Sequence, residues 1–337
     1  MSKFKLTLDN YYSPDRPHVS NSMMNDYLKS RAYYADKYLN KNPDYEFKVT
    51  DPMKVGMAVD IWLTESKKAF DKKYCRKFER TVKRFKRTVK KTDDKELFEA
   101  ETILKNKQDV VYDKESKIIE DQIKNHDEEN VLSSTIYDKA LQVAEYVAKQ
   151  PFWYTNVDDA YFQIPLEGEV EGLQVCGLPD RIDPLGETHY HLTDLKVVSA
   201  MKNSSPKKWF WNAQEMGYLR QLALYQYLWA QKQGVPVTNI MCSHSTASYI
   251  QPGITRVALF RVPQAVLDIA MEEVREIARN IKDENFDDKL VTWNQAQKIG
   301  YENDNKEQDL SDWDAVEDAG GNERFIKSWE PELLASC

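Results

Sequence analysis

A segment in the second half of the chain, Gly177–Val198, reads GLPDRIDPLGETHYHLTDLKVV. Apolar and polar residues alternate on both sides of PLGET, a pattern typical of two antiparallel strands joined by a tight turn. Because alternate residues of a strand share a face, Asp194 and Lys196 should project together, while Leu195 should point to the opposite side. The hairpin should also bring Asp180 close to this pair. The segment therefore predicts two carboxylates and one lysine in one place.

Such a triad suits the hydrolysis of phosphodiesters with the help of a metal ion. Mg²⁺ prefers oxygen ligands, and two carboxylates leave coordination positions open for water and a phosphate oxygen. The ammonium of Lys196 could stabilise the more negative transition state or, with a lowered pKa, help to activate the attacking water. A D-x-K sequence alone is more often an exposed salt bridge, so the surrounding sequence has to decide between the two interpretations.

The surrounding sequence predicts an α/β protein. We expect AYFQIPLE (160–167), GLQVCGLPDRID (172–183) and HYHLTDLKVV (189–198) to form a small antiparallel meander. A long helix should follow over about residues 207–231, then two strands in NIMCSHSTASYI and ITRVALFRV, and then a helix over residues 263–281. Helices are also expected in MMNDYLKSRAYYADKYL and, after Gly56, in GMAVDIWLTES. Together these elements predict a central mixed sheet flanked by helices.

The predicted long helix carries a polar pair, Gln221 and Tyr225, on one of its faces because the two residues are four apart. Glutamine could position a water or a base, and tyrosine could stack or bind phosphate. Such a pair is by itself more often core packing with a polar edge, so its value lies in its place after the D-x-K strand.

Other titratable residues of the hairpin are expected to lie outside this site. Strand alternation places His189 and His191 on the face opposite Asp194, which predicts structural roles for both histidines. Asp183 falls on the other side of its strand from Asp180 and is interpreted as a turn residue before Pro184. The sequence contains no P-loop, dinucleotide-binding glycine motif or serine nucleophile elbow.

Charge is distributed unevenly along the chain, whose net charge is −8. Residues 67–91 contain 13 Lys/Arg and 2 Asp/Glu, whereas residues 302–318 contain 8 Asp/Glu and one lysine. An acidic protein can bind nucleic acid only where positive charge is concentrated, so we expect Arg84, Lys86 and Arg87 to contact the DNA backbone. The alternative is that the basic run is a solvated helix or hairpin face.

The pattern also predicts the domain organisation and the compartment. We expect one nuclease-like domain over residues 1–282, with a basic and mostly helical insertion at about 67–150, followed by an acidic tail or cap at 283–337. Four cysteines stand singly, so neither a disulfide framework nor a C-x-x-C metal site can be inferred from them. Apolar runs are too short for a membrane span. The simplest interpretation is a cytoplasmic protein with no membrane partner.

Three motifs in order, GLPDRID, TDLK and RQLALY, resemble those of PD-(D/E)XK nucleases of the RecB branch, including the RecE-type exonuclease VIII of phage recombination. VSNSMMNDYLKSRAYY resembles the opening helix of that family, and KVGMAVDIWLTE resembles its G-x-A-V-H segment before a variable insertion. The resemblance covers most of residues 10 to 230. The ordered set is much more specific than any single motif.

The resemblance implies a function for each candidate residue. Asp180 and Asp194 would bind Mg²⁺, or alternatively Mn²⁺, with help from the Leu195 carbonyl. Asp60 stands where the family usually places a metal-binding histidine, and we expect it to act as an oxygen ligand, although it adds negative charge and could shift metal preference. Relatives that carry an iron–sulfur cluster use four cysteines, three of them near the C-terminus. Only Cys337 lies beyond residue 242 here, so no cluster is expected.

The remaining implied residues and the activity rest on the same resemblance. Lys196 would be the catalytic lysine, and Gln221 and Tyr225 the auxiliary catalytic pair. The family implies an exonuclease of linear double-stranded DNA, digesting 5′ to 3′ and leaving single strands for an annealing protein, in phage-type recombination or DNA processing. It also implies a ring-like homo-oligomer, in the host cytoplasm if phage-encoded. The alternatives are a metal-dependent endonuclease and a non-catalytic DNA-binding protein that keeps the nuclease fold.

Overall fold

The computed structural model of the chain describes residues 4–45, 49–76, 126–127, 130–154, 158–199, 206–284 and 332–336. These residues fall into two compact units. The first unit contains Met1–Lys48 and Tyr146–Cys337, and the second contains Val49–Glu145. Each unit is described separately below.

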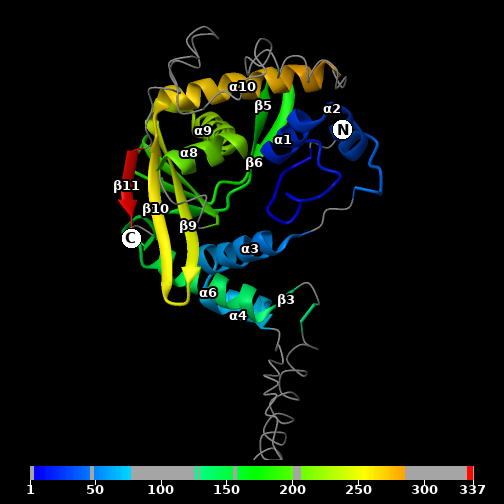
Figure 1. The fold of residues 1–337 in the computed structure, drawn as a ribbon. Helices are drawn as coiled ribbons and strands as arrows, with labels where there is room; N and C mark the ends of the chain where they lie inside the picture. Colours follow the sequence, from blue (N-terminus) through cyan, green and yellow to red (C-terminus); the bar gives the residue numbers. More distant parts are fainter. Residues whose placement is uncertain are drawn as a thin grey trace, which may run out of the picture. The chain divides into compact units, whose positions relative to one another are not determined.

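A six-stranded mixed sheet forms the centre of the first unit (Figure 1). Its strand order is β11-β10-β9-β8-β7-β4. Strands β8 and β9 run parallel, and every other neighbouring pair is antiparallel. The strands are β4 (Tyr161–Phe162), β7 (Arg181–Pro184), β8 (Tyr190–Val197), β9 (Ile240–Gln251), β10 (Ile254–Val262) and β11 (Glu332–Ser336).

A second, three-stranded sheet of this unit has the order β1-β6-β5, with β1 at Val19–Ser20, β5 at Leu166–Val170 and β6 at Leu173–Gly177. The predicted single meander is therefore wrong, because its strands belong to two sheets. The stretch that was interpreted as one strand, GLQVCGLPDRID, contains both β6 and β7. Proline cannot donate a hydrogen bond to a neighbouring strand, and Pro179 lies where the chain leaves one sheet for the other.

The helices of the first unit begin near their predicted positions but are broken more often. The expected first helix consists of α1 (Asn21–Lys29), α2 (Arg31–Tyr34) and a π-helical turn (Ala35–Leu39). Its break lies at Ser30, which is extended and whose hydroxyl accepts a hydrogen bond from the Tyr33 amide at 3.0 Å. Further on are α7 (Pro151–Tyr154), α8 (Pro206–Glu215), α9 (Tyr218–Gln233), a 3₁₀ turn (Val237–Asn239) and α10 (Gln264–Lys282).

The predicted helix over residues 207–231 is two helices, α8 and α9, separated at Gly217. This glycine has a φ of +69°, a left-handed conformation that other residues rarely adopt. Side chains of helix α1 hydrogen-bond to the backbone at this break. The Asn21 side chain donates to the Gly217 carbonyl at 3.2 Å, and the Asn25 side chain donates to the Met216 carbonyl at 3.0 Å. The start of α9 is thus fixed by residues far away in the sequence.

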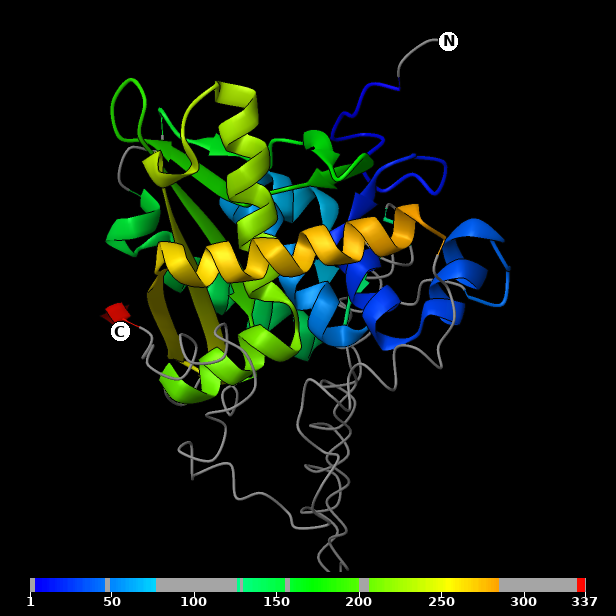
Figure 2. The same ribbon diagram turned by 90° about the horizontal axis from the view of Figure 1, so that it is seen from above.

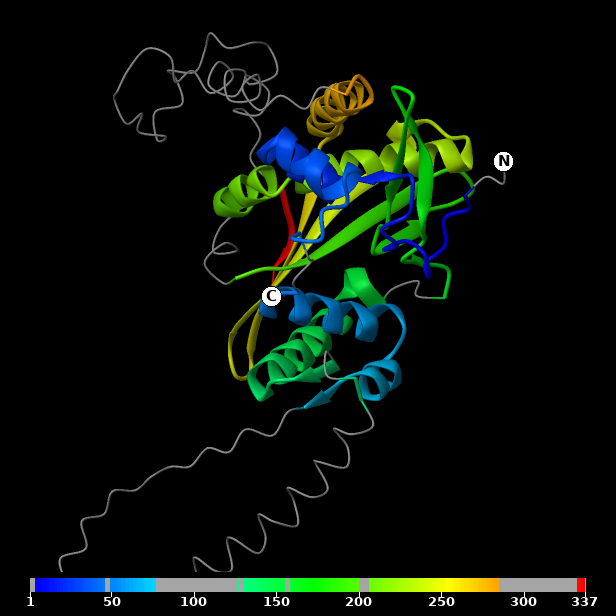
Figure 3. The same cartoon turned by 90° about the vertical axis from the view of Figure 1, so that its right-hand side faces the viewer.

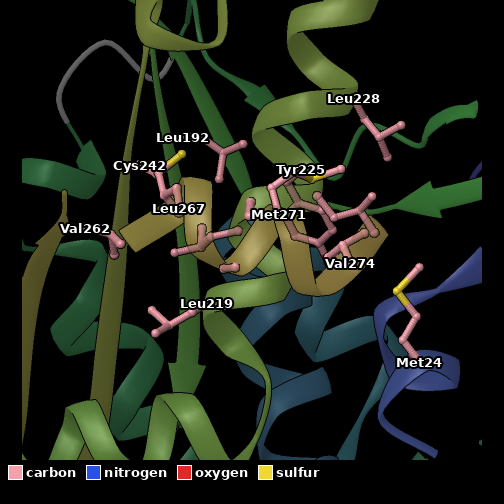
Figure 4. Packing of buried hydrophobic residues seen from close by; sticks show 14 of the residues in the cluster. Met24, Leu192, Leu219, Tyr225, Leu228, Cys242, Val262, Leu267, Met271 and Val274 are labelled. Atoms are coloured by element: carbon pink, nitrogen blue, oxygen red, sulfur yellow. The ribbon is translucent and has the colours of Figure 1, made fainter. Parts of the chain in front are cut away.

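The hydrophobic core of the first unit lies between the sheets and helices α1, α8, α9 and α10. Helix α10 crosses α9 and packs against it (Figure 2). Leu192 of β8 and its neighbour Cys242 of β9 contribute to this core together with Leu267 and Met271 of α10 (Figure 4). Apolar side chains thus anchor one face of β8 at Leu192, two residues before Asp194.

The described part of the second unit contains α3 (Asp51–Thr64), α4 (Lys67–Lys73), β2 (Cys75–Arg76), its parallel partner β3 (Val131–Leu132), and most of α6 (Ser134–Ala148) (Figure 3). Phe70 joins α4 to its neighbours, with ring centroids 5.5 Å from Trp62 and 5.2 Å from Tyr137. Arg84, Lys86 and Arg87 lie outside the described residues, as do most of the predicted acidic tail and of the insertion. Among the described helices, none is long and apolar enough to cross a membrane.

Candidate active site

Strand β8 brings Asp194 and Lys196 together, as the alternation of side chains along a strand predicts. Tyr190 and Leu192 are buried in the core, and Asp194 and Lys196 continue the same face along the strand. The side chain of Asp194 is 1% exposed, and that of Lys196 is 20% exposed. The Lys196 Nζ atom lies 2.6 Å from the Asp194 Oδ2 atom. The pair is therefore not the exposed salt bridge that a D-x-K sequence most often represents.

Asp180 joins this pair from the neighbouring segment. It directly precedes β7, and its Oδ2 atom accepts a hydrogen bond of 2.7 Å from the backbone amide of Leu195. Leu195 stands between Asp194 and Lys196, so the Asp180 carboxylate is tied to the middle of the D-x-K sequence. The predicted convergence of two acids and one lysine is thus present in the structure.

Helix α9 adds the predicted polar pair. The Gln221 side-chain amide donates a hydrogen bond to the Tyr225 hydroxyl at 2.5 Å, and Tyr225 is 4% exposed. A Cβ atom at Gly177 would lie 2.4 Å from the Tyr225 ring, so the end of β6 needs glycine to admit this ring. Burial, followed by the nearby charge of Asp194, raises the pKa of Tyr225 well above its usual value. Tyr225 is therefore a neutral phenol.

Two opposing effects set the charge of Lys196. Burial acts to lower its pKa, but the carboxylates of Asp194 and Asp180 more than offset this effect, and the pKa lies above its usual value. The ring of Tyr218, at the start of α9, also lies 5.3 Å from the Nζ atom, in position for a cation–π contact. Lys196 is therefore a positively charged side chain in a fixed position. Such a group is better suited to stabilising negative charge than to removing a proton from water.

Comparison with known families agrees with this geometry. Residues 18–293 match the family described as the PD-(D/E)XK nuclease superfamily. The chain belongs to this superfamily. It is thus a nuclease by family, with the mixed sheet and flanking helices that the sequence predicted.

One solved structure shows a similar fold. A crystal structure described as a "putative exonuclease" from Eubacterium rectale superposes with a TM-score of 0.54 at 17% sequence identity, covering 84% of this nuclease and 87% of that chain. A structure described as SSO0001 reaches a TM-score of only 0.23 at 14% identity, covers 42% and 59% of the two chains, and carries no argument. No curated protein matches the chain.

Nucleases of this superfamily generally use divalent metal ions, and the acids of this chain fit such an ion. The Asp194 Oδ1 atom is buried and has no hydrogen-bond partner within the described part of the chain. A buried carboxylate oxygen without a partner is unfavourable unless a ligand completes it. The Asp180 carboxylate is positioned by its hydrogen bond from the Leu195 amide, and the Asp194 Oδ1 atom is unpaired among the described residues. Such hard oxygen atoms suit Mg²⁺ or Mn²⁺.

A third protein ligand is not apparent from the described residues, where no group of three or more His, Cys, Asp or Glu side chains could hold a metal. Asp60 lies in α3 of the second unit, and Thr64 donates its hydroxyl to the Asp60 carbonyl at 2.8 Å. Its part in metal binding stays a prediction, as does that of the Leu195 carbonyl.

The other titratable residues of the hairpin lie away from the candidate active site, but the role of one of them, Asp183, was predicted wrongly. His191 contacts the Ser243 hydroxyl at 2.9 Å, and His189 is exposed in the turn. Asp183 is no turn residue. It lies within β7, is buried, and accepts hydrogen bonds from the Nε atom of Arg181 at 2.9 Å and from its Nη2 atom at 2.5 Å. Asp183 compensates the charge of the buried Arg181. It can do so because both residues lie in β7, two positions apart and therefore on the same face of the strand.

Sequence reasoning missed two residues that lie beside the candidate active site, Tyr218 and His244. His244 occupies the position of β9 next to Asp194, and its Nδ1 atom is 4.0 Å from the Asp194 Oδ2 atom. A strand followed by helices and a further strand is typical of a parallel β-α-β connection. That signal could have placed the strand containing His244 beside the D-x-K strand.

Proposed function

We propose that this nuclease is a Mg²⁺-dependent exonuclease that hydrolyses phosphodiester bonds of linear double-stranded DNA, with Mn²⁺ as an alternative metal. The observation that carries the proposal is the convergence of Asp180, Asp194 and Lys196, in which a buried carboxylate oxygen lacks a partner among the described residues. The description of a structural neighbour as an exonuclease supports the proposal at the level of the fold.

Each side chain of the site has a distinct part in this proposal. Asp180 and Asp194 would hold the metal. When bound, the ion would supply Lewis-acid polarisation of the scissile phosphate. The Lys196 ammonium, held beside Asp194, would stabilise the charge that develops on the phosphate oxygens.

Gln221 and Tyr225 would complete the site from α9. Because the phenol of Tyr225 stays protonated, it can donate a hydrogen bond, and the amide of Gln221 fixes its direction. Neither group would carry the proton removed from water. Both would orient the phosphate or the attacking water.

Polarity, partners and assembly follow from the resemblance to RecE-type enzymes and belong to the same proposal. We expect digestion from 5′ to 3′ at double-stranded ends, single strands handed to an annealing protein, and a ring-like homo-oligomer in phage-type recombination or DNA processing. Arg84, Lys86 and Arg87 would grip the DNA backbone. Their replacement by alanine should weaken binding and flatten its dependence on salt, by about one unit of slope for each phosphate that is no longer neutralised.

The decisive experiment compares linear and covalently closed circular duplex DNA, labelled at the 5′ or the 3′ end, with Mg²⁺ and with a chelator. Loss of linear DNA alone, with the 5′ label released first, is the expected result. Nicking of the circle would make the protein an endonuclease, and early release of the 3′ label would reverse the proposed polarity.

Two substitutions in the hairpin serve as the matched pair. Asp194→Asn should lower the rate on the order of 10²–10³-fold. Glu187→Gln changes the same charge at an exposed position of the turn and should leave the rate unchanged. A folded wild-type protein that binds DNA but degrades none, in any metal, would assign the chain to non-catalytic DNA binding.

A further inference from the structure

His244 lies behind Asp194 and has no part in the chemistry proposed above. Parallel pairing of β8 with β9 makes it the direct neighbour of Asp194 in the sheet. Its side chain is 0% exposed, and its Nδ1 atom lies 4.0 Å from the Asp194 Oδ2 atom. This distance is too long for a hydrogen bond. The imidazole thus packs beside the Asp194 carboxylate in the interior of the protein.

Aromatic side chains from two helices hold the imidazole in place. The Trp209 ring of α8 lies 5.5 Å from the His244 ring, and the Tyr218 ring of α9 lies 5.4 Å from it. Trp209 in turn stacks on Phe260 of β10, at 4.4 Å and an interplanar angle of 13°. The His244 ring cannot turn away without moving buried aromatic side chains of the core.

The imidazole is a fully buried polar group. The backbone of Tyr218 lies near the ring, yet neither ring nitrogen makes a hydrogen bond of ordinary geometry to any described residue. A fully buried polar ring without partners is unfavourable compared with an apolar side chain of similar size. Filling the core therefore does not explain a histidine at this position.

A fixed imidazole can restrain the orientation of a carboxylate that lies beside it. At 4.0 Å, the dipole of a ring N–H group acts on the Oδ2 atom electrostatically rather than through a hydrogen bond, and low-dielectric surroundings strengthen this effect. Lys196 already contacts the Oδ2 atom at 2.6 Å, on the side that faces α9 through Tyr218. Neither carboxylate oxygen of Asp194 makes a hydrogen bond of ordinary geometry to a described residue, but Lys196 and His244 both lie beside Oδ2, so the Oδ1 atom is the one that is open to a ligand.

We propose that His244 is a positioning residue that restricts the Asp194 carboxylate to the orientation in which its Oδ1 atom can bind a divalent cation. The inference rests on the proposed metal-dependent function and deepens it. Polar groups that orient a ligating side chain from behind typically change metal affinity by about 10–100-fold when they are removed. His244 therefore contributes to metal affinity without touching the metal.

Direct titration with Mn²⁺, followed by electron paramagnetic resonance of the free ion, tests the inference on the full chain without DNA. The variants are His244→Leu, which removes the polar ring, His244→Asn, which keeps an N–H donor, and Asp194→Asn. We expect leucine to weaken Mn²⁺ binding at least about tenfold and asparagine to restore most of the wild-type affinity. Asp194→Asn should weaken binding more than either histidine variant.

Each outcome has a separate meaning. Wild-type affinity in His244→Leu together with weak binding in Asp194→Asn would overturn the role of His244 and leave the proposed function intact. Equal loss in the leucine and asparagine variants would also overturn it, because no donor effect would then exist. Unchanged affinity in Asp194→Asn would instead contradict the proposed function. Thermal unfolding checks that each variant is folded, and His244→Met replaces the leucine variant if that protein does not fold.

Discussion

The two faces of the β7–β8–β9 region are both buried and polar, but they differ in how their polar groups are paired. On one face, which we call the paired face, lie Arg181, Asp183, His191, Thr193 and Ser243. The Arg181 guanidinium binds Asp183 and donates to the Trp153 carbonyl, and His191 contacts Ser243. On the other, the site face, lie Asp194, Lys196 and His244, where the Asp194 Oδ1 atom and both His244 ring nitrogens have no hydrogen-bond partner among the described residues.

This difference distinguishes the polar groups that stabilise the sheet from those that we propose to bind a ligand. A satisfied buried network rigidifies the sheet, whereas an unsatisfied one is unfavourable and persists where a ligand completes it. Composition alone does not distinguish the faces, because each contains a carboxylate, a cation and a histidine. Next to Leu195, the Ser245 hydroxyl also has no partner in the described part of the chain, but a neutral hydroxyl is less costly to bury than a carboxylate.

The largest expected difference between the faces is in stability. Asp183→Asn should lower the free energy of unfolding by about 3–5 kcal/mol, because it leaves the buried charge of Arg181 uncompensated. The same substitution at Asp194 should cost less, because the Asp180 carboxylate still lies near Lys196, whose side chain is 20% exposed. Chemical denaturation of both variants measures this. Equal losses would mean that pairing does not distinguish the two faces.

The next largest effect concerns the contact between β6 and α9. Gly177→Ala should destabilise the protein by up to about 3 kcal/mol and lower nuclease activity, because the new methyl group would displace the Tyr225 ring. Gly56→Ala, in α3 with open space around its Cα, is the control and should be neutral or slightly stabilising. Full activity and stability in Gly177→Ala would show that Tyr225 has room to move.

A smaller effect should appear in the pH dependence of stability. The unfolded His244 binds a proton below about pH 6.5, whereas the folded residue, with its pKa lowered to about 4, does not until lower pH. Its contribution is therefore present above pH 6.5 and is lost as pH falls towards 4. Between about pH 7.5 and pH 5 the wild type should lose about 2 kcal/mol more than His244→Asn. Parallel stability curves for the two proteins would contradict the neutral, buried histidine.

The smallest effect concerns one hydroxyl. Tyr225→Phe removes the acceptor of the Gln221 amide and should cost about 1 kcal/mol of stability, with a roughly tenfold lower rate if the phenol orients substrate. Tyr190→Phe removes a hydroxyl with a longer contact, 3.4 Å to Gln233, and should have less effect on both quantities. A larger loss in Tyr190→Phe would mean that the Gln221–Tyr225 pair is ordinary core packing.

The sequence was sufficient where local rules decide the structure. Strand parity correctly placed Asp194 with Lys196 and set His191 apart, and helical spacing placed Gln221 beside Tyr225. It failed where the decision depends on tertiary contacts. The turn role of Asp183 was wrong because its partner, the buried Arg181, is recognised only once burial is known. The single meander was wrong because strand periodicity does not say which sheet a strand joins.

His244 shows the same limit within the site. Nothing within the strand NIMCSHSTASYI distinguishes this histidine from a core residue, and only parallel pairing with β8 brings it to Asp194. The residues of the ordered motifs could be predicted because they carry local signals. His244 could not be predicted in this way, because its place beside Asp194 depends on the parallel pairing of β9 with β8.

Two hydrogen bonds from α1 to the break between α8 and α9, which we call the clasp, have a practical consequence for protein engineering. Asn21 and Asn25 hold the backbone at Met216 and Gly217, directly before the helix that presents Tyr218, Gln221 and Tyr225. Arg220 reinforces the clasp with a 2.6 Å hydrogen bond to Asn25. A shortened protein that starts after α1 would keep every motif residue from Asp180 to Tyr225 and still lose the alignment of α9. Expression designs should therefore retain the N-terminal helix.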